Sequence, residues 1–311
     1  MVATESLSRD IMRLIVWYPV RWFVAVAPLG SVFSLFRLMG DIHYLISRGK
    51  KAHVMNNMKN ALGERLGDEG LKTAARYYFR NHYMCQMQVL VYPRLNRGNL
   101  GKIHTFEGLE HLDEALNLGK GCILVHPHFG PAQLPLCALG RLGYPMMQLG
   151  FPTDEGISYI GKKVSFRLRM RYEAMIPAQI ISAMSFLRPL IIWLNSNKVL
   201  MMTGDGAGGG KFIGKFIPVD FLGRKVLFPI GAASLADKTG AVILPMFISL
   251  CDNGTYKTII HRQAEFTGDG KETVKEKVSR FAQMLERYIH KYPYLWHLWD
   301  EWDKRLEKSL Q

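Results

Sequence analysis

Residues 121–142 read GCILVHPHFGPAQLPLCALGRL, and they carry the clearest signal of the fold class. The first part is a short apolar run, which predicts a buried strand. A sharp turn at Phe129-Gly130 follows, and Pro131 suits the first turn of a helix that runs to residue 142. A buried strand that leads directly into a helix is typical of an α/β domain with a partly parallel sheet.

The same alternation continues on the carboxyl side of this stretch. Short apolar runs predict further strands at 144–151, 198–205, 241–250 and 256–266. Between and after them, helical spacing predicts helices at 177–187, 231–238 and 272–290. The first hundred residues show helical spacing nearly throughout. We therefore expect an α/β fold, with a mixed central sheet flanked by helices and a helical region at the N-terminus.

Composition narrows the possible partners. Of the 311 residues, 48% are hydrophobic and 21% are charged, which excludes a disordered, collagen-like or disulfide-scaffold protein. The net charge of +14 predicts an anionic partner: nucleic acid, an acidic membrane surface or an acidic carrier protein. The four cysteines are far apart and form no CxxC pair, which indicates reduced thiols in a cytosolic compartment.

Residues 11–39 form a strongly apolar segment that three arginines and two prolines interrupt. Its longest run without charge is shorter than the ~20 residues of a membrane-spanning helix. Tryptophans beside arginines are typical of a segment that lies at a membrane interface. Two alternatives are a buried helix pair and a tilted span with snorkelling arginines. We expect a membrane-associating helical segment at 1–48, followed by an α/β domain at 49–311.

His128 follows the strand in the opening stretch and precedes the helix, where α/β folds usually place their ligands. An imidazole at this position is suited to act as a general base. Backbone N–H groups around Gly130 can hold an oxyanion, and Gln133 can reach back to the imidazole. The alternative is a turn histidine that bonds local backbone groups. His126 lies two residues earlier, but with no third ligand evident we expect no metal site.

Several blocks in a fixed order carry a family resemblance. They are VMNNMKNALGE at 54–64, HFGPAQ at 128–133, RMRYEAMIPAQI at 169–180, TGDG at 203–206, the run from FIPVDFLG to GAVILPMF at 216–247, and YPYLWHLWDEWDKR at 292–305. Together they resemble the lipid A biosynthesis (lauroyl/myristoyl) acyltransferases, a branch of the lysophospholipid acyltransferase superfamily with the glycerolipid acyltransferase-like fold. The blocks cover most of the chain from about residue 50 to residue 305.

The resemblance implies acyl transfer from an acyl carrier protein or coenzyme A thioester to a hydroxyl of a lipid or glycolipid, with no cofactor. His128 would be the general base. Asp205, with Arg169 or Arg171, would shape the charged site around thioester and acceptor. From the N-terminal segment and the basic net charge, we expect attachment to the cytoplasmic face of the cell inner membrane, with anionic membrane lipid as a partner.

The sequence departs from the family at Gln133, where the family motif has Asp or Glu. An amide can fix the imidazole tautomer, but it brings no negative charge to stabilise imidazolium. Three explanations remain open: Asp205 supplies the charge, the acceptor is acidic enough not to need a full base, or catalysis is lost. The acceptor can thus differ from lipid A, and a non-catalytic protein that binds acyl chains or acyl carrier protein is the alternative.

Two other motifs suggest nucleotide or nucleic-acid binding. TGDGAGGGK at 203–211 satisfies G-x-G-x-x-G, but no helix is expected after it to receive a pyrophosphate. We interpret it as a loop over the site, in which Lys211 attracts anions. The basic block KKVSFRLRMRYEAM at 162–175 belongs to no recognisable nucleic-acid module, so we expect no nucleic-acid partner.

Overall fold

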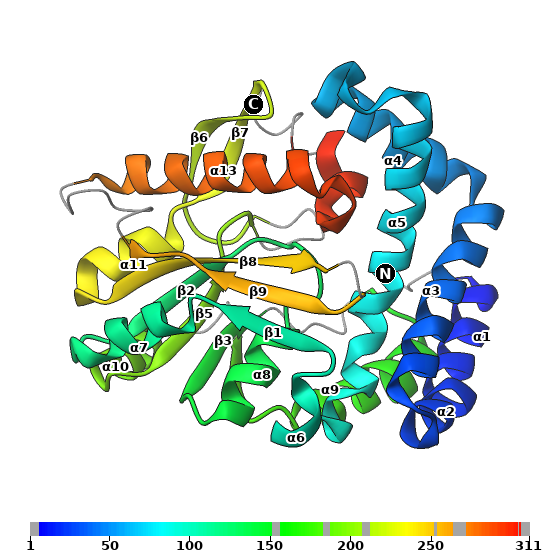
Figure 1. Ribbon diagram of the computed structural model, residues 1–311, viewed down its shortest axis with the longest axis horizontal. Helices are drawn as coiled ribbons and strands as arrows, with labels where there is room; N and C mark the ends of the chain where they lie inside the picture. Colours follow the sequence, from blue (N-terminus) through cyan, green and yellow to red (C-terminus); the bar gives the residue numbers. More distant parts are fainter. Residues whose placement is uncertain are drawn as a thin grey trace.

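The computed structural model describes residues 6–150, 156–182, 187–206, 212–251, 254–263, 272–303 and 305. Within them, a seven-stranded sheet in the order β1-β9-β8-β2-β5-β3-β4 forms the middle of the molecule (Figure 1). Neighbouring strands are parallel except β8 and β9, so the predicted mixed sheet flanked by helices is confirmed. The strands are β1 His104–Glu107, β2 Cys122–His126, β3 Met146–Gly150, β4 Ala178–Ser182, β5 Val199–Thr203, β8 Val242–Leu250 and β9 Tyr256–Ile260.

Helices cover both faces of the central strand β2, which explains its uninterrupted apolar sequence. Ile123 and Val125 pack in one core, with α11 Gly231–Thr239 and α13 Val274–Lys291. Cys122 and Leu124 alternate with them and pack in a second core on the other face. That core includes α7 Leu109–Asn117 and α8 Leu134–Leu142. Each face of β2 thus has its own hydrophobic core.

The N-terminal helices stand together at one side of the sheet (Figure 1). They are α1 Leu7–Ile15, α2 Arg21–Val26, α3 Leu29–Ile46, α4 Arg48–Leu62 and α5 Gly67–Met87, which confirms the predicted helical region. Pro19 lies in a π-helical turn between α1 and α2, and Pro28 precedes α3. Gly40 lets α3 approach α5 closely, because a Cβ there would lie 2.5 Å from the Cα of Arg80.

One side of the N-terminal region is buried in the second core. Trp17, Val24, Val32 and Phe36 pack there. No helix in the described part of the chain combines the length and the apolar content required to cross a bilayer. The division into 1–48 and 49–311 stays a prediction, and α4 begins at its boundary, with Arg48.

Two local predictions differ from the structure. The helix expected at 177–187 is wrong, since β4 occupies Ala178–Ser182 and pairs with β3, and α10 begins only at Arg188. A short apolar segment has no reliable period of its own, so pairing with a neighbouring strand decides its conformation. The antiparallel hairpin β6 Phe216–Phe221 with β7 Arg224–Pro229 was not predicted. The strand expected at 256–266 ends at Ile260, and residues 264–266 lie outside the described part.

Candidate active site

The two central strands of the sheet end side by side. β2 and β5 are parallel, and their register pairs His126 with Thr203. His128 and Asp205 each lie two residues beyond this last pair. Strand pairing therefore brings together two groups that are 77 residues apart in the chain. Their position at the carboxyl edge of the parallel strands is the one predicted for the site.

The His128 imidazole is directed at Asp205, with Nδ1 2.8 Å from Oδ1. The backbone N–H of His128 donates to Oδ2 over 2.9 Å, so the carboxylate holds both the ring and the main chain. Because an ionised carboxylate only accepts hydrogen bonds, the ring in its neutral form carries its proton on Nδ1 and keeps a lone pair on Nε2. The His128 side chain is 25% exposed and that of Asp205 is 0% exposed. An accessible imidazole backed by a buried carboxylate can act as a general base.

Asp205 remains ionised although it is buried. Burial alone would raise the pKa of its carboxyl, but the charge and hydrogen bonds of His128 and the Arg305 guanidinium lower that pKa to about 2. The carboxylate thus carries a negative charge at neutral pH, and it stabilises a positively charged imidazole beside it.

The C-terminal tail completes the surroundings of the pair. Trp296 Nε1–H donates to Asp205 Oδ2 over 3.1 Å, and buried Arg305 donates to the Asp205 carbonyl over 2.6 Å. The backbone N–H of His297 donates to the His128 carbonyl over 2.9 Å. From the sequence, this tryptophan-rich tail contributed only to the family resemblance, and these three residues were given no part in the site. No local signal could have found them, since Trp296 lies 91 residues from its partner in the chain.

Gly130 positions the turn after His128. Its φ of 61° is in the left-handed region, and a Cβ there would lie 3.1 Å from Ile248. The Gly130 N–H donates to the Leu295 carbonyl over 2.8 Å, and its carbonyl lies 2.9 Å from His297 Nε2. Both main-chain groups are used within the protein. The N–H predicted to hold a substrate oxygen is therefore already engaged, and Gly130 shapes the turn instead.

Gln133 immediately precedes α8 and is half-buried. Within the described residues its side chain makes no hydrogen bond to His128, because Asp205 occupies the Nδ1 side of the ring. Of the three explanations for the missing family acid, this geometry favours the one in which Asp205 supplies the negative charge.

The other predicted substrate-binding residues lie apart from the pair or outside the described part. Arg169 is on α9 Arg167–Glu173, and its Nε lies 2.7 Å from Glu173 Oε1. Arg171 is exposed on the same helix. In the described part of the chain, neither arginine makes a hydrogen bond to the His–Asp pair. Lys211 lies outside the described residues.

His126 is buried beneath the turn. Its Nδ1 lies 3.0 Å from the Pro127 carbonyl oxygen, and burial lowers its pKa to about 4, so the ring is neutral. No three His, Cys, Asp or Glu side chains of the described residues gather into a metal-binding group.

The fold and the pair first define a class: an α/β protein with a general base at the carboxyl edge of parallel strands, suited to activating a hydroxyl. The family follows from comparison with known proteins. The model of the bacterial lipid A biosynthesis acyltransferase family matches residues 6–302, and the chain belongs to this family. It is by family an acyltransferase of lipid biosynthesis, which confirms the resemblance seen in its sequence blocks.

Two relatives are phosphatidylinositol mannoside acyltransferases. The chain is 24% identical over 212 residues to the protein of Mycolicibacterium smegmatis, covering 66% of this chain and 64% of that relative. It is 25% identical over 231 residues to a protein of Mycobacterium tuberculosis, covering 71% and 68%. The similarity thus spans about two thirds of each relative's length.

Proposed function

We propose that the protein transfers a fatty acyl group from an acyl carrier protein or coenzyme A thioester to a hydroxyl of a lipid or glycolipid. The hydrogen-bonded pair of His128 and Asp205 at the carboxyl edge of β2 and β5 carries this proposal. It supplies a base, fixed in one tautomer, to a chain whose family performs acyl transfer.

In the proposed reaction, His128 Nε2 accepts the proton of the acceptor hydroxyl as the oxygen attacks the thioester carbonyl. The tetrahedral intermediate collapses, the C–S bond breaks, and the leaving thiolate takes the proton from the imidazolium. Asp205 stabilises the imidazolium between these two transfers. The thioester is itself activated, so the proposed chemistry needs no metal or cofactor.

The names of the relatives support a glycolipid acceptor, and lipid A is the acceptor that the family name describes. We propose that the acceptor is a phosphate-bearing glycolipid of this general kind. Its identity is open to direct test, because transfer adds one acyl chain to the product mass.

The test uses purified full-length protein with acyl carrier protein or coenzyme A donors and total membrane lipid as acceptor. Thiol release and mass spectrometry of the lipid product report transfer. His128→Ala should abolish transfer without loss of folding, while His290→Ala, at an exposed histidine of α13, should leave it unchanged. Retention of more than about a tenth of the rate in His128→Ala would remove His128 as the base. If wild type shows no turnover with either donor, the non-catalytic binder replaces the enzyme.

We further propose that the N-terminal helices rest on the anionic cytoplasmic face of the cell inner membrane. α1 has no buried residue, Trp22 is 62% exposed and Val26 is 83% exposed. The same helical region carries several large exposed apolar residues: Leu7, Ile11, Met12, Ile15, Tyr18, Trp22, Phe23 and Val26. Such a cluster is typical of an interaction surface.

Positive charge lies next to these apolar side chains. Trp17 Nε1 donates to Ser165 Oγ over 2.9 Å, which fixes the helical turn before α2 against Gly161–Phe166. That segment and the start of α9 expose Lys162, Lys163 and Arg167. Each cation near an anionic bilayer contributes about 1 kcal/mol to binding, so apolar insertion and charge act together.

Sedimentation with vesicles of phosphatidylglycerol and phosphatidylcholine tests this membrane contact. Trp22→Ala with Val26→Asp should strongly reduce binding. Leu118→Asp should not, since Leu118 is 61% exposed at the end of α7, a helix that lies remote from α1 in Figure 1. Point variants are preferable to deletion of residues 1–39, because Phe36 is fully buried and its loss would open the core. Equal sedimentation of all variants would contradict the proposal.

A further inference from the structure

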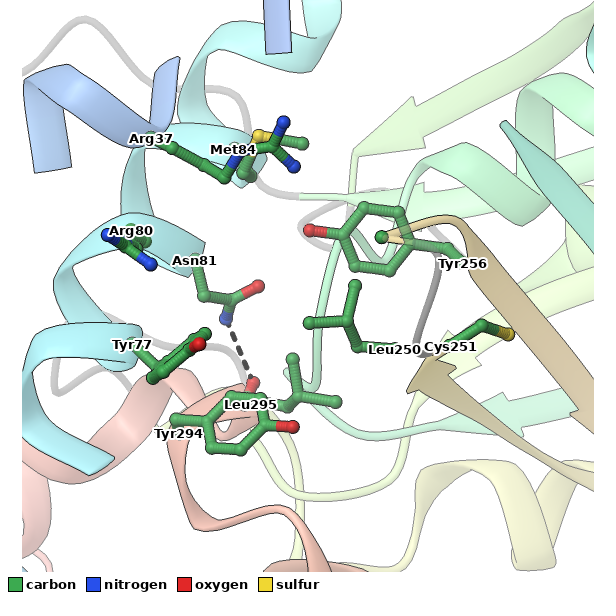
Figure 2. Close-up of a pocket in the computed structure, with 11 residues that line it drawn as sticks. Arg37, Tyr77, Arg80, Asn81, Met84, Leu250, Cys251, Tyr256, Tyr294 and Leu295 are labelled. Atoms are coloured by element: carbon green, nitrogen blue, oxygen red, sulfur yellow. Dashed lines mark hydrogen bonds between the residues drawn. The ribbon is translucent and has the colours of Figure 1, made fainter. Parts of the chain in front are cut away.

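A cleft lies between the N-terminal helices and the edge of the sheet. One cavity of about 210 Å³ lies between α3, α5, the end of β8 and the tail (Figure 2). A second cavity, of about 450 Å³, lies toward the start of α3. Arg37, Met84, Gly254 and Tyr256 line both, so the two cavities adjoin along one wall.

The cleft reaches the back of the active-site turn. A small apolar pocket shares Met84 and Tyr256 with both cavities and is bounded on its other side by Pro131 and Leu134. These two residues follow the His128 turn directly. In the first cavity, the carbonyl of Leu295 accepts the hydrogen bond of Asn81 Nδ2 shown in Figure 2 and also that of the Gly130 N–H.

The described walls of the cleft are basic at the mouth and apolar inside. Arg37 and Lys102 line the larger cavity, and within the described residues neither forms an ion pair with a carboxylate. The hydrogen bond from Arg37 to Ser34 is long, at 3.4 Å. Arg80, by contrast, is held by Asp41 through two hydrogen bonds of 2.8 and 2.7 Å. Two cations over an apolar interior suit an amphiphile with an anionic head.

The apolar part has the character of an acyl-chain site. Phe33, Met84 and Ile103 also line the larger cavity, and Met84 and Ile103 are buried. Leu29 and Gly30 line it too, and they follow Val26, which is exposed on the proposed membrane face. The cavity is therefore close in the chain to the surface from which a membrane lipid would come.

We propose that Arg37 and Lys102 bind the phosphate of a phospholipid-type acceptor, whose acyl chain lies along Phe33, Met84 and Ile103. The proposal rests on the proposed function, since it assigns the acceptor of that reaction to this cleft. It selects an acceptor that carries both a phosphate and an acyl chain, and it gives the N-terminal helix α3 a direct part in substrate recognition.

Calorimetry with short-chain, soluble dihexanoyl phosphatidic acid tests the site without a bilayer. Wild type should bind it, and Arg37→Gln or Lys102→Gln should each weaken binding by about 10-fold, as expected for a lost charge-assisted hydrogen bond. Lys238→Gln, at an exposed lysine of α11, removes the same charge elsewhere and should change nothing. Three further ligands separate the contributions to binding. Dihexanoyl glycerol carries the acyl chains without the phosphate, glycerol 3-phosphate carries the phosphate without the chains, and coenzyme A represents the donor.

Absence of phosphatidic acid binding, or equal binding by all variants, would overturn the proposal. Glycerol 3-phosphate binding as tightly as phosphatidic acid would remove the chain site. Coenzyme A binding that depends on Arg37 would assign the cleft to the donor and overturn the acceptor assignment. His128→Ala should bind phosphatidic acid normally while losing transfer. If it retains transfer, the proposed catalytic role of His128 fails while the binding result stands by itself.

Discussion

Replacement of Asp205 by Asn tests the catalytic pair directly. The carboxylate accepts three hydrogen bonds, from His128 Nδ1, from the His128 backbone N–H and from Trp296 Nε1. Asparagine offers one oxygen and one NH₂ group. The backbone and indole N–H groups can only donate, so they take the oxygen, and the NH₂ faces the imidazole. The ring then takes the opposite tautomer, with the proton on Nε2, where the acceptor proton has to go.

The expected loss combines charge and tautomer. The surroundings lower the pKa of Asp205 from 3.8 to about 2. A hydrogen bond between charged groups contributes ~1.5–3 kcal/mol, so loss of the negative charge beside the imidazolium should lower the rate by roughly 10- to 100-fold. The wrong tautomer adds to this loss, and the corresponding Asp-to-Asn change in a serine protease lowers kcat by ~10⁴. We expect kcat to fall by ~10² to 10⁴.

Thiol release from a single thioester donor measures this loss across a range of pH. Asp220→Asn is the matched control, because this hairpin aspartate is exposed and contacts Lys225. Since the pair acts as a unit, His128→Ala combined with Asp205→Asn should be no slower than His128→Ala alone. A rate within about fivefold of wild type for Asp205→Asn, or fully additive losses in the double variant, would refute the reasoning.

Other changes test the surroundings of the pair and the buried histidines. Gln133→Glu should give no gain in rate, since Asp205 already provides the charge, and a faster enzyme with an unchanged pH–rate profile would contradict this. Trp296→Phe removes the indole N–H that donates to the carboxylate, so kcat should fall about 10-fold, and an unchanged kcat would exclude this role. Because the smaller ring also leaves a cavity in the core, Tm should fall as well. Burial lowers the pKa of His104 and His126 to about 3 and about 4, against 6.5 when unfolded. As pH falls from 6 to 4, these two histidines bind protons in the unfolded chain before they do so in the folded protein. The free energy of unfolding should therefore fall by up to ~1.4 kcal/mol per pH unit for each histidine. A free energy of urea unfolding that does not change with pH would contradict this.

Local sequence patterns were sufficient to predict much of the fold and one half of the pair. The elements within residues 121–142 were predicted correctly, because a buried strand, a turn with glycine and a helix each leave a local pattern. The same locality placed His128 at a strand end. The segment Ala178–Ser182 was predicted wrongly because a short apolar run has no period, and only its pairing with β3 makes it a strand.

Contacts between distant segments select the group that completes the site. Spacing within the family motif pointed to Gln133, near His128 in the chain, and left Asp205 as one of three open explanations for the missing charge. The observed partner is Asp205, 77 residues away. The register of β2 on β5 decides this, because it places residues two positions beyond His126 and Thr203 side by side. Strand register depends on contacts across the whole sheet, and a local sequence pattern does not contain them. The hydrogen bond from Trp296 to Asp205 likewise exists only because the tail folds back over the turn.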